Sequence, residues 1–187
     1  MKTEIVRTLE VLKKGGTILY PTDTIWGLGC DATNFDAVEK IKNIKRRIDE
    51  KRFIVLIDSI DNLYKYVKDA AEISFDLIEK YNKPLTIVYP RAYGVAKNVI
   101  ADDGTLAIRV VKHEFCRELI KQLGSPLLSS SANISGNVAP SSFDAISKEV
   151  INSVDYAVQL YRDNINQFNA STLIKLDDSG SFIVLRD

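Results

Sequence analysis

Apolar and polar side chains follow two different periods along this chain. Residues 3–14 place apolar side chains at the spacing of one helical face, and the pair Gly15-Gly16 ends the segment. The same spacing recurs after Asn34, a residue type that caps helices. The pattern predicts helices over these two segments and over residues 61–68, 70–81, 113–123 and 143–151.

Short apolar runs between turn residues predict the strands. Residues 53–57 are apolar throughout, which is typical of a strand covered on both faces. Residues 20–29 and 129–136 are expected to be loops that follow strands. Helices and strands alternate through most of the chain, so we expect an α/β architecture with a largely covered sheet. The other predicted strands are residues 17–20, 85–89, 106–110, 126–128, 171–176 and 182–185.

The composition limits the classes of function. The chain has 187 residues, of which 45% are hydrophobic, and this is enough to bury the core of one domain. It carries 25 basic and 25 acidic side chains, so its formal net charge is zero. A site for a polyanion must therefore come from local clustering of charge. This balance argues against a protein that simply coats nucleic acid.

The cysteines and the N-terminus point to a cytoplasmic protein. Cys30 and Cys116 belong to no CxxC pair and to no Cys/His cluster, so we expect reduced thiols and no structural zinc site. The charged N-terminal segment lacks the continuous apolar region of a secretory signal. No apolar run approaches the roughly 20 residues of a membrane span, so we expect no membrane association.

Residues 20–29 form the first candidate site. This segment leaves a buried strand and brings together hydroxyl groups, a carboxylate and the single tryptophan, Trp26. Loops at strand ends are where α/β proteins bind ligands, and Gly27 and Gly29 permit close backbone approach. The alternative is an ordinary Pro-Thr-Asp turn with Trp26 in the core.

Residues 39–52 form the second candidate, with seven basic and three acidic side chains. Lys45 and Arg47 lie two positions apart where the helical pattern ends, so both can point into one space. Lysine offers a point charge and arginine a planar fork for phosphate or carboxylate. The alternative is a solvated helix end, where cations also suit the helix dipole.

Residues 129–136 form the third candidate, because four hydroxyls and one amide follow an apolar strand. Such a loop can donate hydrogen bonds to anionic oxygens, or it can satisfy only its own backbone.

Arg109 lies inside an apolar strand and needs a partner or a ligand, unless the strand is at a sheet edge. His113 has no evident triad partners and is interpreted as part of a helix N-terminus. GxxxxGK[ST] and GxGxxG motifs are absent.

Together these segments resemble the YrdC/TsaC family of threonylcarbamoyl-AMP synthases. Residues 20–29, YPTDTIWGLG, are similar to the family signature YPT-[ED]-T-x-[YF]-G-L-G. Residues 45–47 match its K-x-R motif, and residues 106–110 are similar to its arginine-containing strand. Residues 131–136, SANISG, match its S-x-N motif, and residues 171–172 its late Ser-Thr element. Each motif is weak alone, whereas five in order along nearly the whole chain are specific.

The resemblance implies a fold and a reaction. It implies one YrdC-like domain over residues 1–187, with a twisted mixed sheet and flanking helices around an open concave groove and no additional C-terminal domain. The implied enzyme is a nucleotidyltransferase that converts L-threonine, bicarbonate or CO2, and ATP to threonylcarbamoyl-AMP and pyrophosphate. Mg2+ would accompany the triphosphate, and no metal site in the protein is expected. A tRNA-threonylcarbamoyl transferase complex would then modify an adenosine beside the tRNA anticodon.

The resemblance also implies a catalytic set. Lys45 and Arg47 would hold the ATP phosphates, while Arg46 between them would turn away. Ser131 and Asn133 would bind the nucleotide or the carbamate.

Further residues would bind substrate. Lys51 lies where the family has another nucleotide contact, and Thr24 would contact threonine or its carbamate. Thr86 matches the threonine of the family's P-G-P-L-T segment. The other expected substrate-binding residues are Arg109, Ser129 and Ser171.

Departures from the family pattern concern the threonine side most. Asn82-Lys83 replaces the usual Pro-Gly, and residues 162–170 lack the usual glycines and are a candidate lid. Two alternatives therefore stay open. One is an RNA-binding module that uses the basic residues 40–52, with steeply salt-dependent tRNA binding. The other is a nucleotide-binding paralogue that acts on another carbamoyl or acyl substrate.

Overall fold

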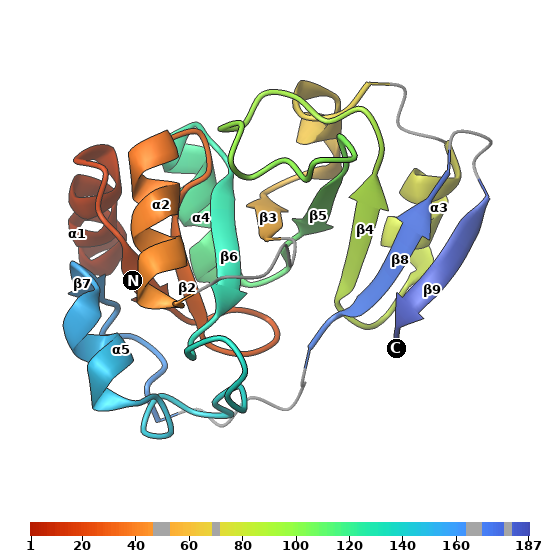
Figure 1. Cartoon of the computed structure of the whole chain (residues 1–187). Coiled ribbons are helices and arrows are strands. Elements are labelled where there is room, and N and C mark those ends of the chain that lie inside the picture. The colour runs from red at the N-terminus through yellow and green to blue at the C-terminus, as the bar shows by residue number, and fades with distance from the viewer. Residues whose placement is uncertain (47–52, 69–71, 164–169, 178–180) are drawn as a thin grey trace.

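The computed structural model describes residues 1–46, 53–68, 72–163, 170–177 and 181–187. Within these ranges one mixed sheet runs through the molecule in the order β7-β1-β2-β6-β3-β5-β4-β8-β9 (Figure 1). Three neighbouring pairs are parallel, namely β1 with β7, β3 with β5, and β4 with β8. The strands are β1 (Ile18–Tyr20), β2 (Gly27–Asp31), β3 (Ile54–Ile57), β4 (Leu85–Tyr89), β5 (Leu106–Val110), β6 (Leu127–Ser131), β7 (Tyr156–Ala157), β8 (Thr172–Leu176) and β9 (Phe182–Arg186).

Helices flank this sheet, and local capping explains several of their ends. The side chain of Asn34 accepts a hydrogen bond from the Ala37 amide, as predicted for a cap. Gly124 ends another helix in the left-handed conformation, at φ 76°. The helices are α1 (Lys2–Lys13), α2 (Phe35–Ile44), the 3-10 helix η1 (Ile60–Lys65), α3 (Glu72–Lys80), α4 (Glu114–Leu123) and α5 (Lys148–Ser153). The predicted mixed sheet with flanking helices is confirmed.

Two apolar layers cover the two faces of the sheet. On one side α1 and α4 pack against Ile18 of β1 and Leu56 of β3. On the other side α2 packs against the neighbouring residues Leu19 and Val55. Successive strand residues thus enter opposite layers, because side chains alternate across a strand. Figure 1 shows α2 in front of the sheet and α4 behind it. The predicted covering of both faces is confirmed for this half of the sheet.

The prediction of loops at residues 20–29 and 129–136 is partly wrong. Gly27 and Gly29 begin β2, which lies between β1 and β6, and Ser129 to Ser131 extend β6. A Cβ on residue 29 would lie 2.3 Å from the carbonyl oxygen of Leu128, so glycine permits close strand packing there. Glycine and serine have weak strand propensity, and pairing on both sides of β2 overrides it.

Three other elements differ from the prediction. Helix α5 begins at Lys148 instead of residue 143, because Ser147 caps it by accepting from the Val150 amide. Residues 61–68 were expected to be α-helical, but a 3-10 helix, η1, ends at Lys65. Strand β7 was not predicted, since it has only two residues and depends on pairing with β1.

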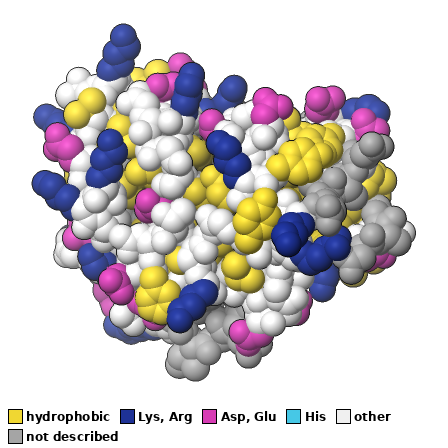
Figure 2. Space-filling model, turned by 90° about the horizontal axis from the view of Figure 1, so that it is seen from above, with side chains coloured by type: hydrophobic (Ala, Val, Ile, Leu, Met, Phe, Trp, Pro, Cys, Tyr) yellow, Lys and Arg dark blue, Asp and Glu magenta, His cyan; other side chains and the backbone are white. Residues whose placement is uncertain are grey.

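Charged side chains are dispersed over the surface. Among the described residues, Figure 2 shows basic groups scattered between acidic and apolar ones on the upper face. In the part of the chain that the structure describes, no helix has the length and apolarity needed to span a bilayer.

Candidate active site

A pocket of about 520 Å3 lies where several chain segments meet. Its walls come from the loop between β1 and β2, the end of β6, the residues just before and at the start of β8, two residues of β5, and one residue each of β3, β4 and β9. The loop between β1 and β2 and the start of β8 lie at the lower side of the molecule in Figure 1. The lining residues are Thr22, Thr24, Ile25, Trp26, Gly27, Ile54, Val88, Ala107, Arg109, Ser129, Ser130, Ser131, Ala139, Ala170, Ser171, Leu173 and Arg186.

Threonine hydroxyl groups hold the loop between β1 and β2 in shape. The Thr22 hydroxyl donates to the carbonyl of Ile25 at 2.7 Å and accepts from the Thr24 amide at 3.0 Å. It also lies 2.9 Å from the Thr24 hydroxyl. The next side chain, Trp26, is buried and packs edge-on against Phe143, with ring centroids 4.9 Å apart. The alternative that placed Trp26 in the core is confirmed. Trp26 also lines the pocket.

Arg109 is a buried cation in the pocket wall. Strand β5 lies between β3 and β4, so the alternative of an edge-strand arginine that reaches solvent is wrong. Its NH2 group lies 3.2 Å from Oδ1 of Asp23, and its NH1 group donates to the Thr24 hydroxyl at 3.2 Å. A charge in this position requires a counter-charge or a ligand. Asp23 supplies the counter-charge from a distant part of the sequence.

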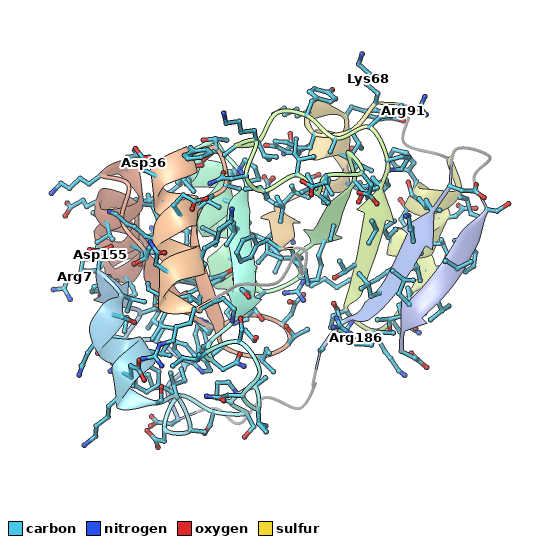
Figure 3. All side chains as sticks on the ribbon, viewed as in Figure 1. Arg7, Asp36, Lys68, Arg91, Asp155 and Arg186 are labelled. Carbon is cyan, nitrogen blue, oxygen red and sulfur yellow. The ribbon has the colours of Figure 1, made fainter. Side chains whose placement is uncertain are left out.

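Arg186 brings a second guanidinium to the same pocket, from the end of β9. Its Nε and NH2 groups donate to the carbonyl oxygen of Ser171 at 3.1 and 2.9 Å. Arg186 is exposed at one side, and its partial burial lowers its pKa, which the positive charge of Arg109 lowers further. Two cations that repel each other line one pocket, and an anionic ligand would relieve this repulsion. Figure 3 labels Arg186 at the lower side of the sheet.

Ser171 connects the pocket to a buried hydroxyl behind it. The hydroxyls of Ser171 and Thr86 lie 2.6 Å apart. Thr86 is fully buried and does not line the pocket. Thr86 can therefore affect a ligand through Ser171, whose hydroxyl it contacts.

Lys45 follows the last residue of α2 and holds the chain segment after β6. Its ammonium group donates to the carbonyl oxygens of Ser131 at 2.7 Å and Asn133 at 2.8 Å. The side-chain amide of Asn133 donates to the backbone carbonyls of Ile134 and Asn137 at 3.1 and 2.6 Å, so this side chain shapes the same turn. Both residues stand beside the pocket without being among those that line it.

The backbone leaves the helical conformation after Lys45. Arg46 has φ 49°, in the left-handed region, and its guanidinium pairs with Glu149 at the surface. Arg47 and Lys51, expected to contact ATP, lie outside the described residues. Most of the candidate lid, residues 164–169, also lies outside them.

The structure thus brings five of the expected residues to one pocket. They come from β5, β6 and the segments before β2 and β8, and they are Thr24, Arg109, Ser129, Ser131 and Ser171. Sequence reasoning missed Arg186, and it missed Asp23 as the partner of Arg109. Both arginines belong to short apolar strands, Arg109 within one and Arg186 at the end of another. The argument applied to Arg109 could therefore have identified Arg186 as well.

The pocket can bind an anion next to apolar groups. Its donors are two guanidinium groups and several hydroxyls, while Ile25, Ile54, Val88 and Leu173 supply apolar walls.

His113 lies at the start of α4, as expected. In the described ranges, no three His, Cys, Asp or Glu side chains gather in a way that could hold a metal ion.

Comparisons with known proteins find both similar sequences and similar folds. The family model Sua5/YciO/YrdC, described as telomere recombination, matches residues 10–187. A threonylcarbamoyl-AMP synthase of Pseudoalteromonas translucida is 37% identical over 138 residues, covering 72% of this chain and 74% of that protein. A putative threonylcarbamoyl-AMP synthase of Methanocaldococcus jannaschii is 35% identical over 179 residues, covering 92% of this chain and 82% of that protein.

Among solved structures, P. abyssi Sua5 in complex with L-threonine superposes with a TM-score of 0.88 at 27% identity. The match covers 97% of this chain and 53% of the Sua5 chain. This chain therefore spans about half the length of that relative.

Proposed function

Because the chain belongs to the Sua5/YciO/YrdC family, we propose that it is an L-threonylcarbamoyladenylate synthase. It would make threonylcarbamoyl-AMP and pyrophosphate from L-threonine, bicarbonate or CO2, and ATP. The observation that carries the proposal is the pocket itself, where Arg109 and Arg186 lie among serine and threonine hydroxyls. The similarity to relatives named threonylcarbamoyl-AMP synthase supports the same conclusion.

The reaction joins two anions, and this explains the need for such a pocket. The amine nitrogen of threonine bonds to the carbon of CO2 and loses a proton, which forms a carbamate. A carbamate oxygen then attacks the α-phosphorus of ATP, and the bond to the bridging oxygen of the β-phosphate breaks to release pyrophosphate. Bicarbonate in place of CO2 releases one water. Bringing together two negative species requires positioning and neutralisation of charge, and no protein nucleophile is needed.

We assign the threonine side of the pocket to Thr24 and Arg109, because the guanidinium of Arg109 already bonds the Thr24 hydroxyl. Arginine offers a planar fork that suits a carboxylate. Ser171 would contribute to the same side through a hydroxyl held by Thr86.

We assign the nucleotide side to Arg186, Ser129, Ser131 and Asn133, together with Lys45, Arg47 and Lys51. Lys45 would shape this side by fixing the turn after β6, and its role toward phosphate stays a prediction. Mg2+ would enter with the triphosphate and take phosphate oxygens and water as ligands, and pocket hydroxyls suit hydrogen bonds to those waters. The product would pass to a tRNA-threonylcarbamoyl transferase complex in the cytoplasm.

Incubation with ATP, bicarbonate and labelled L-threonine tests the proposal. We expect pyrophosphate release that depends on threonine, with a labelled threonylcarbamoyl-AMP product. Arg186→Gln is expected to lower turnover at least about tenfold, equal to about 1.4 kcal/mol of transition-state stabilisation. Arg7→Gln is the matched control, because Arg7 is exposed on α1 at the opposite end of the molecule from Arg186 (Figure 3).

Two results would refute the proposal or its assignment of Arg186. Pyrophosphate release that is indifferent to threonine, together with tight and salt-dependent tRNA binding, would favour an RNA-binding module. Equal turnover of Arg186→Gln and Arg7→Gln would remove Arg186 from the substrate-binding residues.

A further inference from the structure

We propose that Asp23 is a positioning residue that sets the orientation of the Arg109 guanidinium in the pocket wall. The inference rests on the proposed function where threonine binding is the readout. Residues 22 and 24–27 all line the pocket, and Asp23 is the one member of this segment that does not. Asp23 therefore does not line the pocket itself, but it pairs with a residue that does, Arg109.

Asp23 joins three parts of the fold. Its side chain is 12% exposed and that of Arg109 is 4% exposed, with Oδ1 and NH2 3.2 Å apart. Its other oxygen, Oδ2, accepts a hydrogen bond from the Lys112 amide at 3.0 Å, between β5 and α4. One carboxylate thus ties the pocket loop to the strand that carries Arg109.

The remaining surroundings of Arg109 leave its orientation to Asp23. Among the described residues, its side chain also donates a hydrogen bond to the neutral hydroxyl of Thr24. Its Nε is buried and has no hydrogen-bond partner in the described part of the chain, and the same holds for Oδ1 of Asp23. Attraction between opposite charges, and not a hydrogen bond, therefore joins Arg109 to Asp23. The second cation, Arg186, repels Arg109, since the positive charge of Arg109 lowers the pKa of Arg186. Without Asp23, a buried cation would face a neutral group and a like charge, so the guanidinium would leave this position.

The opposite reading of Asp23 predicts an opposite sign. If Asp23 were only a negative charge near an anion site, its removal would strengthen anion binding, because repulsion would disappear. If Asp23 positions Arg109, its removal weakens binding although the site becomes more positive.

The test compares L-threonine binding by calorimetry, and turnover, in the wild-type protein and in Asp23→Asn. Asparagine keeps the shape and can still accept from the Lys112 amide, but it has no charge. We expect the KM for threonine to rise about 10- to 100-fold, as for a misplaced binding group. The KM for ATP should change much less. Asp23→Glu, which keeps the charge, should recover most of the affinity.

Asp155→Asn is the matched control. The Asp155 carboxylate also accepts from a backbone amide, that of Thr17 at 2.7 Å, and from the Thr17 hydroxyl at 3.0 Å. Figure 3 places Asp155 near β7, at the opposite end of the sheet from Arg186. Its substitution should lower stability without changing the KM for threonine.

A double-mutant cycle decides whether Asp23 acts through Arg109. In the Arg109→Gln background, Asp23→Asn should have no further effect on threonine binding. The double variant also has no unpaired buried charge, so it can be measured even if Asp23→Asn alone fails to fold. A further loss in that background, or unchanged or tighter binding in Asp23→Asn, would overturn the proposal. If the wild-type protein binds no threonine, the proposed function fails. A crystal structure of Asp23→Asn then decides on Asp23, because an unmoved Arg109 guanidinium overturns its assignment and a displaced one supports it.

Discussion

Lys45 places its ammonium group on the carbonyl oxygens of Ser131 and Asn133, and its side chain is buried. Charge-assisted hydrogen bonds of this kind are stronger than neutral ones, and a buried carbonyl left without a donor is costly. The lysine therefore joins the end of α2 to the segment after β6 that borders the pocket. The side chain of its neighbour Arg46 is exposed and forms a surface ion pair with Glu149.

We predict that Lys45→Met lowers the free energy of unfolding by about 2–4 kcal/mol, because two charge-assisted hydrogen bonds are lost. Arg46→Met is the matched control, and its exposed ion pair should contribute less than about 1 kcal/mol. Urea denaturation followed by circular dichroism measures both. Equal midpoints for the two variants would contradict the structural role of Lys45.

His113 supplies a second prediction at this scale. Burial lowers its pKa from the ordinary value of 6.5, while the nearby charges of Asp23 and Glu114 oppose that shift. The folded state therefore binds a proton less readily than the unfolded state. The stabilisation due to neutral His113 is complete above about pH 6.5 and is lost as the pH falls through the lower folded pKa.

Thermal unfolding should thus show a lower Tm at pH 5.5 than at pH 7.5, and His113→Gln should remove part of this difference. The ring also packs edge-on against Tyr161, with centroids 5.1 Å apart, so the substitution should lower the Tm at both pH values. An identical pH dependence in the two proteins would show that other groups cause it.

At the scale of elements, β9 is the least protected strand. Among the described strands it pairs with β8 alone, and each of its residues is exposed, including Ile183 at 61% and Val184 at 59%. An apolar strand with a free edge offers unpaired N–H and C=O groups to another chain. A charged residue on such an edge disfavours pairing between molecules.

Ile183→Lys is accordingly expected to raise the temperature at which the protein begins to aggregate, as measured by static light scattering. Val138→Lys is the control, because Val138 is 93% exposed but lies in a loop. An equal improvement from both variants would indicate a general effect of charge and would contradict a role for the strand edge.

At the scale of the whole molecule, the pocket is assembled from nearly the full length of the chain. Its walls include Thr22 near one end of the sequence and Arg186 near the other. The pocket can therefore exist only in the folded protein, so a ligand that binds it must stabilise the whole fold.

L-Threonine at about 100 times its Kd should stabilise the protein by about 2.7 kcal/mol. For a chain of this size that corresponds to a Tm increase of about 5–10 °C. Differential scanning fluorimetry measures the shift, which should largely disappear in Arg109→Gln. A shift that persists in this variant would place the threonine site elsewhere.

The sequence by itself determined the features that depend on neighbouring residues. The cap at Asn34, the left-handed Gly124 and the helical spacing of α1 and α4 act over a few positions, so local physics predicts them. The continuous apolar run that became β3 also indicated a strand covered on both faces. The order of the motifs indicated the family, which the comparisons confirm.

Only the tertiary structure decided which distant groups meet. Gly27 and Ser131 are in strands because β2 and β6 pair with each other, and no local propensity predicts this pairing. Asp23 faces Arg109 because the loop after β1 reaches β5 across the sheet. Arg186 joins the pocket because β9 lies beside β8. Strand pairing and ion pairs between remote residues depend on the path of the whole chain, so the partners of each charge appear only in the fold.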